Sequence, residues 1–298
     1  MRTRRGLCTG ALLAAAVLLT GACSQATGSG TTAAPSVLPV AQPGGTGSPA
    51  SGDATGTGAA SASSSASAIT SASAAATADS ALAGKTVVLD PGHDGGNESH
   101  PSEVNKLVPQ GFGQSKPCDN TGTNGDDGYP EHEFTFTVAL LVQQILQQHG
   151  LKVILTRTND TGVGPCVNIR AQIGNDAPAA AAVSIHADGN YGGHGYQILE
   201  AVKSVGGPAN DAKSHQLAVA MHNTFSAESG FTPSTYAGVN GYEPRTDIAG
   251  LNLSTVPKVL VECGNMRDSG DLSLEESPTG RQHIAQAIAD GIMAFLSS

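Results

Sequence analysis

Two histidines and one glutamate stand shortly after apolar, β-branched runs of the sequence, where a buried strand would end: His93, His186 and Glu262. Short runs of this kind, bounded by glycine and proline, predict buried strands. In α/β proteins, catalytic and ligand-binding groups collect beyond the carboxyl ends of the strands. We therefore expect these three side chains to meet at one edge of a sheet.

Imidazole and carboxylate groups bind zinc well, and a catalytic zinc site uses three protein ligands with a fourth position open for water. His93 and His186 would supply two ligands. The third should be a carboxylate on a rigid element, and Glu131 is the best candidate because it lies in the first turn of a strongly predicted helix. A hydrogen-bond acceptor is also expected behind His186, and Asp188 or Asp90 could serve.

Within that helix, Glu131 lies on the same side as Phe134 and Val138, which would face the core. A carboxylate that points toward the core needs a partner, which a metal ion would provide. In the alternative interpretation, Glu131 only complements the positive end of the helix dipole. His132 and Glu133 compete as ligands, but their side chains leave the helix in other directions.

Glu262 ends a strongly apolar run, and two interpretations are open. It could be a general base that takes a proton from a water activated by the metal. It could also be a buried carboxylate that is bonded to the backbone or to an arginine such as Arg245 or Arg267. Arg245 in turn could contact the substrate or form a structural ion pair.

The elements that would position these residues alternate along the chain. Strands are predicted at residues 86–90, 152–156, 181–185, 195–202 and 256–262, and helices at residues 130–149, 168–175, 211–226 and 279–296. This alternation predicts an α/β fold, a single three-layer domain in which helices flank a central mixed, mostly parallel sheet. Residues 97–128, rich in glycine, proline and asparagine, are expected to form an irregular insertion that faces the substrate.

The first 83 residues differ in composition from the rest of the chain. Residues 1–22 carry three arginines followed by an apolar run, which is typical of an export signal peptide. Gly21-Ala22-Cys23 resembles the lipobox of bacterial lipoproteins, so Cys23 is the expected lipid anchor, with ordinary signal cleavage as the alternative. Residues 23–83, rich in alanine, serine, glycine and threonine, predict a disordered linker before a catalytic domain at residues 84–298.

The charge balance and the positions of the cysteines indicate which partners the protein can bind and in which redox compartment it works. Three of the 15 basic residues lie in residues 1–22, so 12 remain against 25 acidic residues, and this balance argues against a nucleic-acid partner. Cys118 and Cys166 lie in loops rich in turn-forming residues, and in an oxidising compartment they are expected to form a disulfide. Cys263 ends an apolar run and is expected to be a buried thiol.

Five motifs follow one another along the chain: Leu89-Asp90-Pro91-Gly92-His93, Glu131 at the start of a helix, Val153-Ile154-Leu155-Thr156-Arg157, Ser184-Ile185-His186-Ala187-Asp188, and Leu260-Val261-Glu262-Cys263-Gly264-Asn265-Met266. Together they resemble the zinc-dependent N-acetylmuramoyl-L-alanine amidases, which are bacterial peptidoglycan hydrolases. The resemblance extends from residue 86 to residue 296, and no wall-binding module is evident. Two features depart from the family: Thr135 and Thr137 stand where asparagine is frequent, and residues 97–128 are not part of the common core.

This resemblance implies that His93, Glu131 and His186 bind Zn²⁺ and that Glu262 is the catalytic glutamate. The implied reaction is hydrolysis of the amide bond between N-acetylmuramic acid and L-alanine, in intact peptidoglycan or in soluble muropeptides. The protein would be an exported, monomeric enzyme of the cell envelope. It would be either anchored to the membrane through Cys23 or secreted to the periplasm or cell wall.

Three other functions are compatible with the sequence. The domain could be a wall-binding scaffold without activity, although degenerate relatives usually lose a ligand or the glutamate, and all four are present here. It could be an amidase that residues 97–128 inhibit by covering the zinc. It could also be a zinc carboxypeptidase that acts on stem peptides, which would release D-alanine instead of exposing the amino group of L-alanine.

Overall fold

The computed structural model describes residues 80–298 with the exception of residue 178. The predicted signal peptide, Cys23 and nearly all of the predicted linker lie outside the described residues. Leu82 is buried against the core, so the folded part of the chain begins slightly before residue 84. None of the described helices is both long enough and apolar enough to cross a membrane.

A six-stranded sheet forms the centre of this part of the chain, in the order β4-β1-β5-β8-β6-β7. Its strands are β1 (Thr86–Pro91), β4 (Lys152–Leu155), β5 (Ala181–Asp188), β6 (Gln197–Ala201), β7 (Tyr242–Arg245) and β8 (Lys258–Asn265). The strands β4, β1, β5 and β8 are parallel, whereas β6 is antiparallel to β8 and parallel to β7. The sheet is therefore mixed and mostly parallel, as predicted.

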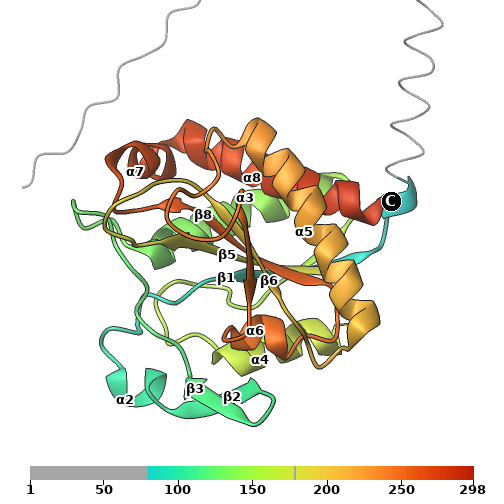
Figure 1. Cartoon of the computed structure of the whole chain (residues 1–298), viewed down its shortest axis with the longest axis horizontal. Helices are drawn as coiled ribbons and strands as arrows, with labels where there is room; N and C mark the ends of the chain where they lie inside the picture. The colour runs from blue at the N-terminus through green and yellow to red at the C-terminus, as the bar shows by residue number, and fades with distance from the viewer. Residues whose placement is uncertain (1–79, 178) are drawn as a thin grey trace, which may run out of the picture. The chain divides into compact units, whose positions relative to one another are not determined.

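Helices cover both faces of the sheet (Figure 1): α3 (Glu131–Gln148), α5 (Pro208–Glu228) and α8 (Pro278–Leu296) on one face, and α4 (Val167–Asp176) and α6 (Ala249–Asn252) on the other. The largest hydrophobic cluster lies between the sheet and the three long helices, and it includes Phe134 and Val138 from the predicted apolar side of α3. Smaller clusters around Val88 and Leu260 pack against α4 and α6. The predicted three-layer α/β fold is confirmed.

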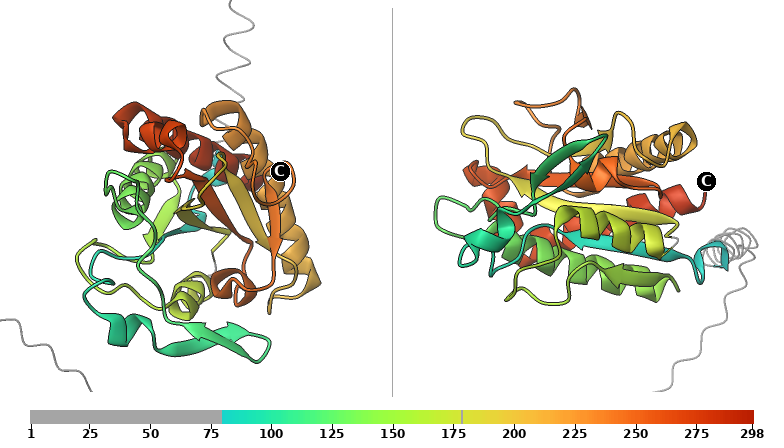
Figure 2. Two further views of the ribbon diagram at one scale, coloured as in Figure 1. Left: turned by 60° about the vertical axis from the view of Figure 1, so that its left-hand side comes forward. Right: turned by 90° about the horizontal axis from the view of Figure 1, so that it is seen from below.

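The expected irregular insertion at residues 97–128 instead contains regular elements: α2 (Pro101–Val104) and a hairpin of β2 (Leu107–Gly111) and β3 (Gln114–Pro117). Figure 2 (left) shows this hairpin in green at the bottom of the view, next to α4 and α6 and away from the main sheet. Phe112 and Gly113 form its two-residue turn, and both have the positive φ that such turns require. The sequence pattern does not predict the hairpin, because Pro109 weakens the strand pattern and the turn lacks the common Asn-Gly pair.

Candidate metal centre

His93 lies in the tight turn that follows β1, with a positive φ of 58°. The residue before it, Gly92, lies directly against β5, since a Cβ atom at Gly92 would be 2.3 Å from Cε1 of His186. Glycine is therefore required at this position for a steric reason. The close approach brings the rings of His93 and His186 to 5.0 Å between centroids, nearly perpendicular to each other.

Glu131, the first residue of α3, directs a buried carboxylate at both histidines. Its Oε1 lies 2.9 Å from Nδ1 of His186 and 3.2 Å from Nε2 of His93. Its Oε2 accepts a hydrogen bond from the backbone N–H of Thr123. Both oxygens are therefore held in place, one by the insertion and one by the histidines.

The two competing ligand candidates of the same helix turn do not join this group. His132 directs Nδ1 to the carboxylate of Asp160, at 2.8 Å. Glu133 is exposed to solvent. The structure therefore brings Glu131, and neither neighbour, to the two histidines.

The three side chains fit a zinc ion. One ligand atom each from His93, Glu131 and His186 lies within 4.8 Å of the other two. A tetrahedral zinc ion with bonds of about 2 Å holds its ligand atoms roughly 3.3 Å apart. The observed separations between Glu131 and the histidines, 2.9 and 3.2 Å, are similar. Two imidazoles and one carboxylate also form one of the common ligand sets of catalytic zinc.

The charges at this point favour a cation. Burial alone would lower the pKa of His93, but the carboxylates of Glu131 and Asp119 outweigh burial and raise that pKa to about 10. Burial would raise the pKa of Glu131, yet the two histidines hold it well below its usual range. The carboxylates thus create a negative potential that either a proton or a metal cation can satisfy.

Glu262 lies on β8 directly beside His186 of β5, in the register of the parallel pair. Its Oε2 atom is buried and has no hydrogen-bond partner among the described residues. Burial, together with the charges of Glu131 and Asp188, raises the pKa of Glu262 well above its usual value. A carboxylate oxygen without a partner therefore lies next to the three candidate ligands.

The two arginines considered as partners of Glu262 are engaged elsewhere. They form ion pairs with other acids: Arg245 with Glu243 and Asp247, and Arg267 with Asp126. Arg245 therefore forms the structural ion pair that the sequence left open. The interpretation that Glu262 forms an ion pair with Arg245 or with Arg267 is therefore wrong.

A cavity of about 420 Å³ lies at the carboxyl ends of the parallel strands and is lined by His93, Glu131, His186 and Glu262. Parts of the insertion between Lys116 and Thr123 line it as well. The expectation that residues 97–128 face a substrate site therefore agrees with the position of the insertion. The four residues therefore share one cavity, which also contacts the insertion.

Asp119 is a neighbour of the site that the sequence did not reveal. Its Oδ1 lies 3.2 Å from Nδ1 of His93, on the side of the ring away from Glu131. No apolar run precedes Asp119, so the strand-end pattern that marked the histidines does not apply to it. It follows Cys118, which forms the predicted disulfide with Cys166.

Asp90 and Asp188, the expected acceptors behind His186, bond to other groups. Asp90 is the centre of a buried network with four donors: Thr156, Arg170, Ser184 and Lys258. Burial would raise the pKa of Asp90, but Lys258 and Arg170 hold it well below the usual value. Asp188 accepts hydrogen bonds from the backbone of Gly189 and from Gln197.

Comparison with known proteins agrees with this geometry. The model of the N-acetylmuramoyl-L-alanine amidase family matches residues 87–294. An N-acetylmuramoyl-L-alanine amidase of Mycobacterium tuberculosis is 39% identical over 224 residues, which cover 73% of this chain and 88% of that protein.

Two solved structures are also similar to this chain. The N-acetylmuramyl-L-alanine amidase Ami1 of Mycobacterium smegmatis has 45% sequence identity and a TM-score of 0.69, with 72% of this chain and 98% of that chain covered. The apo form of Ami1 from Mycobacterium abscessus has 45% identity and a TM-score of 0.68, with 72% and 100% covered. The protein described here belongs to the N-acetylmuramoyl-L-alanine amidase family.

Proposed function

We propose that this protein is a zinc-dependent amidase that hydrolyses the bond between N-acetylmuramic acid and the L-alanine of the stem peptide in peptidoglycan. Family membership supports the amidase activity. The observation that carries the zinc dependence is the convergence of His93, Glu131 and His186 beside the partnerless carboxylate oxygen of Glu262. All four residues line one cavity of about 420 Å³, in which the proposed substrate would bind.

His93, Glu131 and His186 would hold the zinc ion. When bound, zinc supplies a Lewis acid that lowers the pKa of water toward about 7 and polarises a carbonyl group. Glu262 takes a proton from the attacking water on its Oε2 atom and then donates that proton to the amide nitrogen of the departing L-alanine. The backbone N–H of Thr123 and the two histidines keep Glu131 from turning away.

The same proposal places the enzyme outside the cytoplasm, with residues 1–22 as export signal, residues 23–83 as linker and residues 84–298 as catalytic domain. The disulfide between Cys118 and Cys166 supports export, because disulfides persist in oxidising compartments. Lipidation of Cys23 would tether the enzyme to a membrane, and the linker would let the domain reach the cell wall. We propose a monomer that acts on peptidoglycan or muropeptides and has no nucleic-acid partner.

Digestion of a muramyl peptide by the purified protein, with products identified by mass spectrometry, tests the proposal. We expect cleavage that separates muramic acid from L-alanine, stops with a chelator and returns with zinc. Release of D-alanine would instead identify a carboxypeptidase. Zinc binding without any cleavage would point to inhibition by residues 97–128, and the absence of both would leave the scaffold interpretation.

Matched variants test the ligand set in the same assay. Glu131→Ala should remove zinc from the protein, because a site with only two histidines binds the ion weakly. Glu133→Ala removes a carboxylate from the same helix turn and should keep both zinc and activity, since Glu133 is exposed. Loss of zinc in the second variant and not in the first would contradict the assignment.

A further inference from the structure

The two ring nitrogens of His93 have different surroundings. Nε2 faces Glu131 and the candidate metal position, whereas Nδ1 lies 3.2 Å from Oδ1 of Asp119 and 3.2 Å from the backbone carbonyl oxygen of Asn120. A carboxylate and a carbonyl oxygen can only accept hydrogen bonds. With neutral imidazole, the proton must therefore lie on Nδ1, which leaves the lone pair of Nε2 available to a metal.

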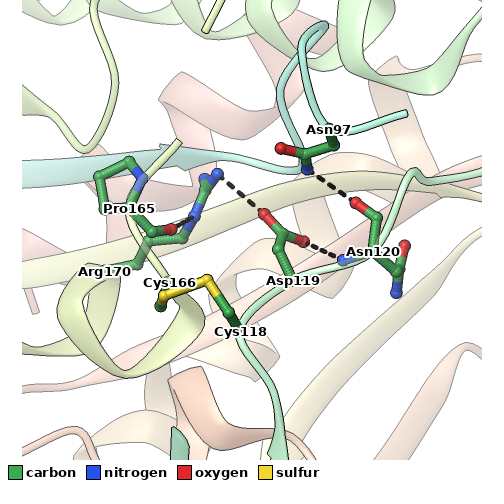
Figure 3. The surroundings of a disulfide bond; sticks show 7 residues. All are labelled: Asn97, Cys118, Asp119, Asn120, Pro165, Cys166 and Arg170. Atoms are coloured by element: carbon green, nitrogen blue, oxygen red, sulfur yellow. Dashed lines mark hydrogen bonds and ion pairs between the residues drawn. A yellow bond between two sulfur atoms is a disulfide. The ribbon is translucent and has the colours of Figure 1, made fainter. Parts of the chain in front are cut away.

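Asp119 is itself fixed by donors on its other sides (Figure 3). Its Oδ1 accepts a hydrogen bond of 2.8 Å from the backbone N–H of Asn120, and its Oδ2 pairs with Arg170 at 3.3 Å. Arg170 also donates to the backbone carbonyl of His93 at 2.8 Å. Asp119, Arg170 and His93 are all buried. The acid and the turn that carries His93 are thus held by one guanidinium group.

The disulfide joins the two segments that carry this arrangement. Cys118 precedes Asp119 directly, and Cys166 directly precedes α4, which carries Arg170 in its first turn. Figure 3 shows Asp119 and Arg170 meeting beside the disulfide. In addition, Asn97 donates a hydrogen bond of 2.7 Å to the carbonyl of Asn120, so that second acceptor of His93 is held as well.

We propose that Asp119 is a positioning residue for the metal centre: its carboxylate fixes the tautomer and orientation of His93 and thereby strengthens zinc binding. This inference rests on the proposed zinc site. A carboxylate behind a zinc-bound histidine raises the basicity of the ring and locks it in place, and its loss commonly weakens metal binding about 10- to 100-fold. Asp119 does not touch the ion or the substrate in this role and acts through His93.

The test is the zinc dissociation constant of the full protein, measured by competition with a chromophoric chelator. His93, Asn120 and Arg170 all donate hydrogen bonds to the two oxygens of Asp119. In Asp119→Asn an NH₂ group, which can only donate, replaces one of these oxygens and must therefore face one of the three donors. We expect zinc binding about 10-fold weaker or more in this variant. In the zinc-bound protein labelled with ¹⁵N-histidine, NMR should show the Nδ1 proton of His93 exchanging faster with water.

Asp160→Asn is a closely matched control, because Asp160 also pairs with one histidine and one arginine, His132 and Arg157. His132 is not among the candidate ligands, so this variant should keep the zinc affinity of the unaltered protein. An equal loss in both variants, or no loss in Asp119→Asn, would overturn the inference while leaving the zinc site itself intact. Failure of the unaltered protein to bind zinc would overturn the proposed function as well.

Discussion

Glu262 and His186 are direct neighbours on two parallel strands, β8 and β5. The backbone hydrogen bonds between these strands therefore fix the distance between the Cα atoms that carry the two side chains. The strand register therefore places the proposed base beside a proposed zinc ligand without help from a loop. A base must lie within hydrogen-bond reach of the proton it takes. A rigid sheet provides this geometry before substrate arrives.

The first prediction concerns the proton transfer by Glu262. Glutamine has the same shape as glutamate but cannot accept a proton at neutral pH, so Glu262→Gln should lower turnover by about 10²–10⁴-fold. The zinc content should stay at the level of the unaltered protein, because Glu262 is not a member of the three-residue ligand group. Product formation by mass spectrometry and bound zinc by atomic emission measure the two quantities.

Glu243→Gln serves as the control, since Glu243 lies on the edge strand β7 and pairs with Arg245. This variant should retain activity. Unchanged turnover in Glu262→Gln would rule out Glu262 as the general base, and loss of zinc in that variant would make it a ligand instead.

The second prediction concerns the contact between Gly92 and His186. Gly92→Ala would place a Cβ atom 2.3 Å from Cε1 of the His186 ring, so the ring or the turn must move. Because Glu131 already holds Nδ1 of His186, that movement should weaken zinc binding strongly. The zinc dissociation constant measures the effect.

Gly174→Ala is a matched control for the same substitution. Gly174 lies within α4, where a Cβ atom would meet only ordinary contacts at 3.7 Å and beyond. Alanine inside a helix stabilises by about 0.5–1 kcal/mol relative to glycine, so this variant should be slightly more stable and bind zinc normally. Normal zinc binding by Gly92→Ala would contradict the steric argument.

The third prediction concerns the disulfide. Replacing both Cys118 and Cys166 by serine should lower the unfolding free energy by about 2–5 kcal/mol, as for other native disulfides. It should also weaken zinc binding, because the disulfide holds Asp119 next to Arg170. Adding Asp119→Asn to the double serine variant should then weaken zinc binding less than Asp119→Asn does alone. Strictly additive effects on zinc affinity would show that the disulfide does not act through Asp119.

Sequence patterns predicted the elements that are defined by long apolar runs. The run Val87–Leu89 identified β1, and the side shared by Phe134 and Val138 identified both α3 and the inward direction of Glu131. Because parallel strands end at one edge of the sheet, strand ends also predicted that His93 and His186 meet there. These predictions depend only on local patterns and on general properties of α/β folds.

The features that sequence patterns missed depend on tertiary contacts. Strand β7 contains Pro244, which weakens a strand pattern but is tolerated on the edge of a sheet. Asp119 acquires its position next to His93 from the disulfide and from Arg170, which lies 51 residues later in the chain. No local pattern encodes such a contact. Sequence patterns instead predict an acceptor behind His186, at Asp188 or Asp90, and both of these bond to other groups.

The last prediction concerns Glu275, which is fully buried and lies on α7 (Ser269–Glu276). Both oxygens of its carboxyl group lack a hydrogen-bond partner among the described residues. Burial, followed by the nearby charges of Asp271 and Glu131, raises its pKa well above the usual value. An unsatisfied buried polar group costs about 1–3 kcal/mol of stability. Glu275→Met should therefore raise the unfolding free energy, because methionine has a similar length and carries no charge.

The stabilisation by Glu275→Met should depend on pH. The carboxyl group of the unfolded chain ionises above about pH 4.3, whereas the buried group stays protonated to higher pH. Between these two pKa values the folded state keeps a proton that the unfolded chain has lost. The unfolding free energy of the protein with Glu275 therefore falls as the pH rises, by up to about 1.4 kcal/mol per pH unit, until the folded pKa is reached. Urea denaturation should show a larger gain for Glu275→Met at pH 7 than at pH 4. Glu98→Met, at an exposed position, should show no such trend. The prediction is contradicted if Glu275→Met raises the unfolding free energy by the same amount at pH 4 and at pH 7. Glu275 would then ionise in the folded protein as it does in the unfolded chain.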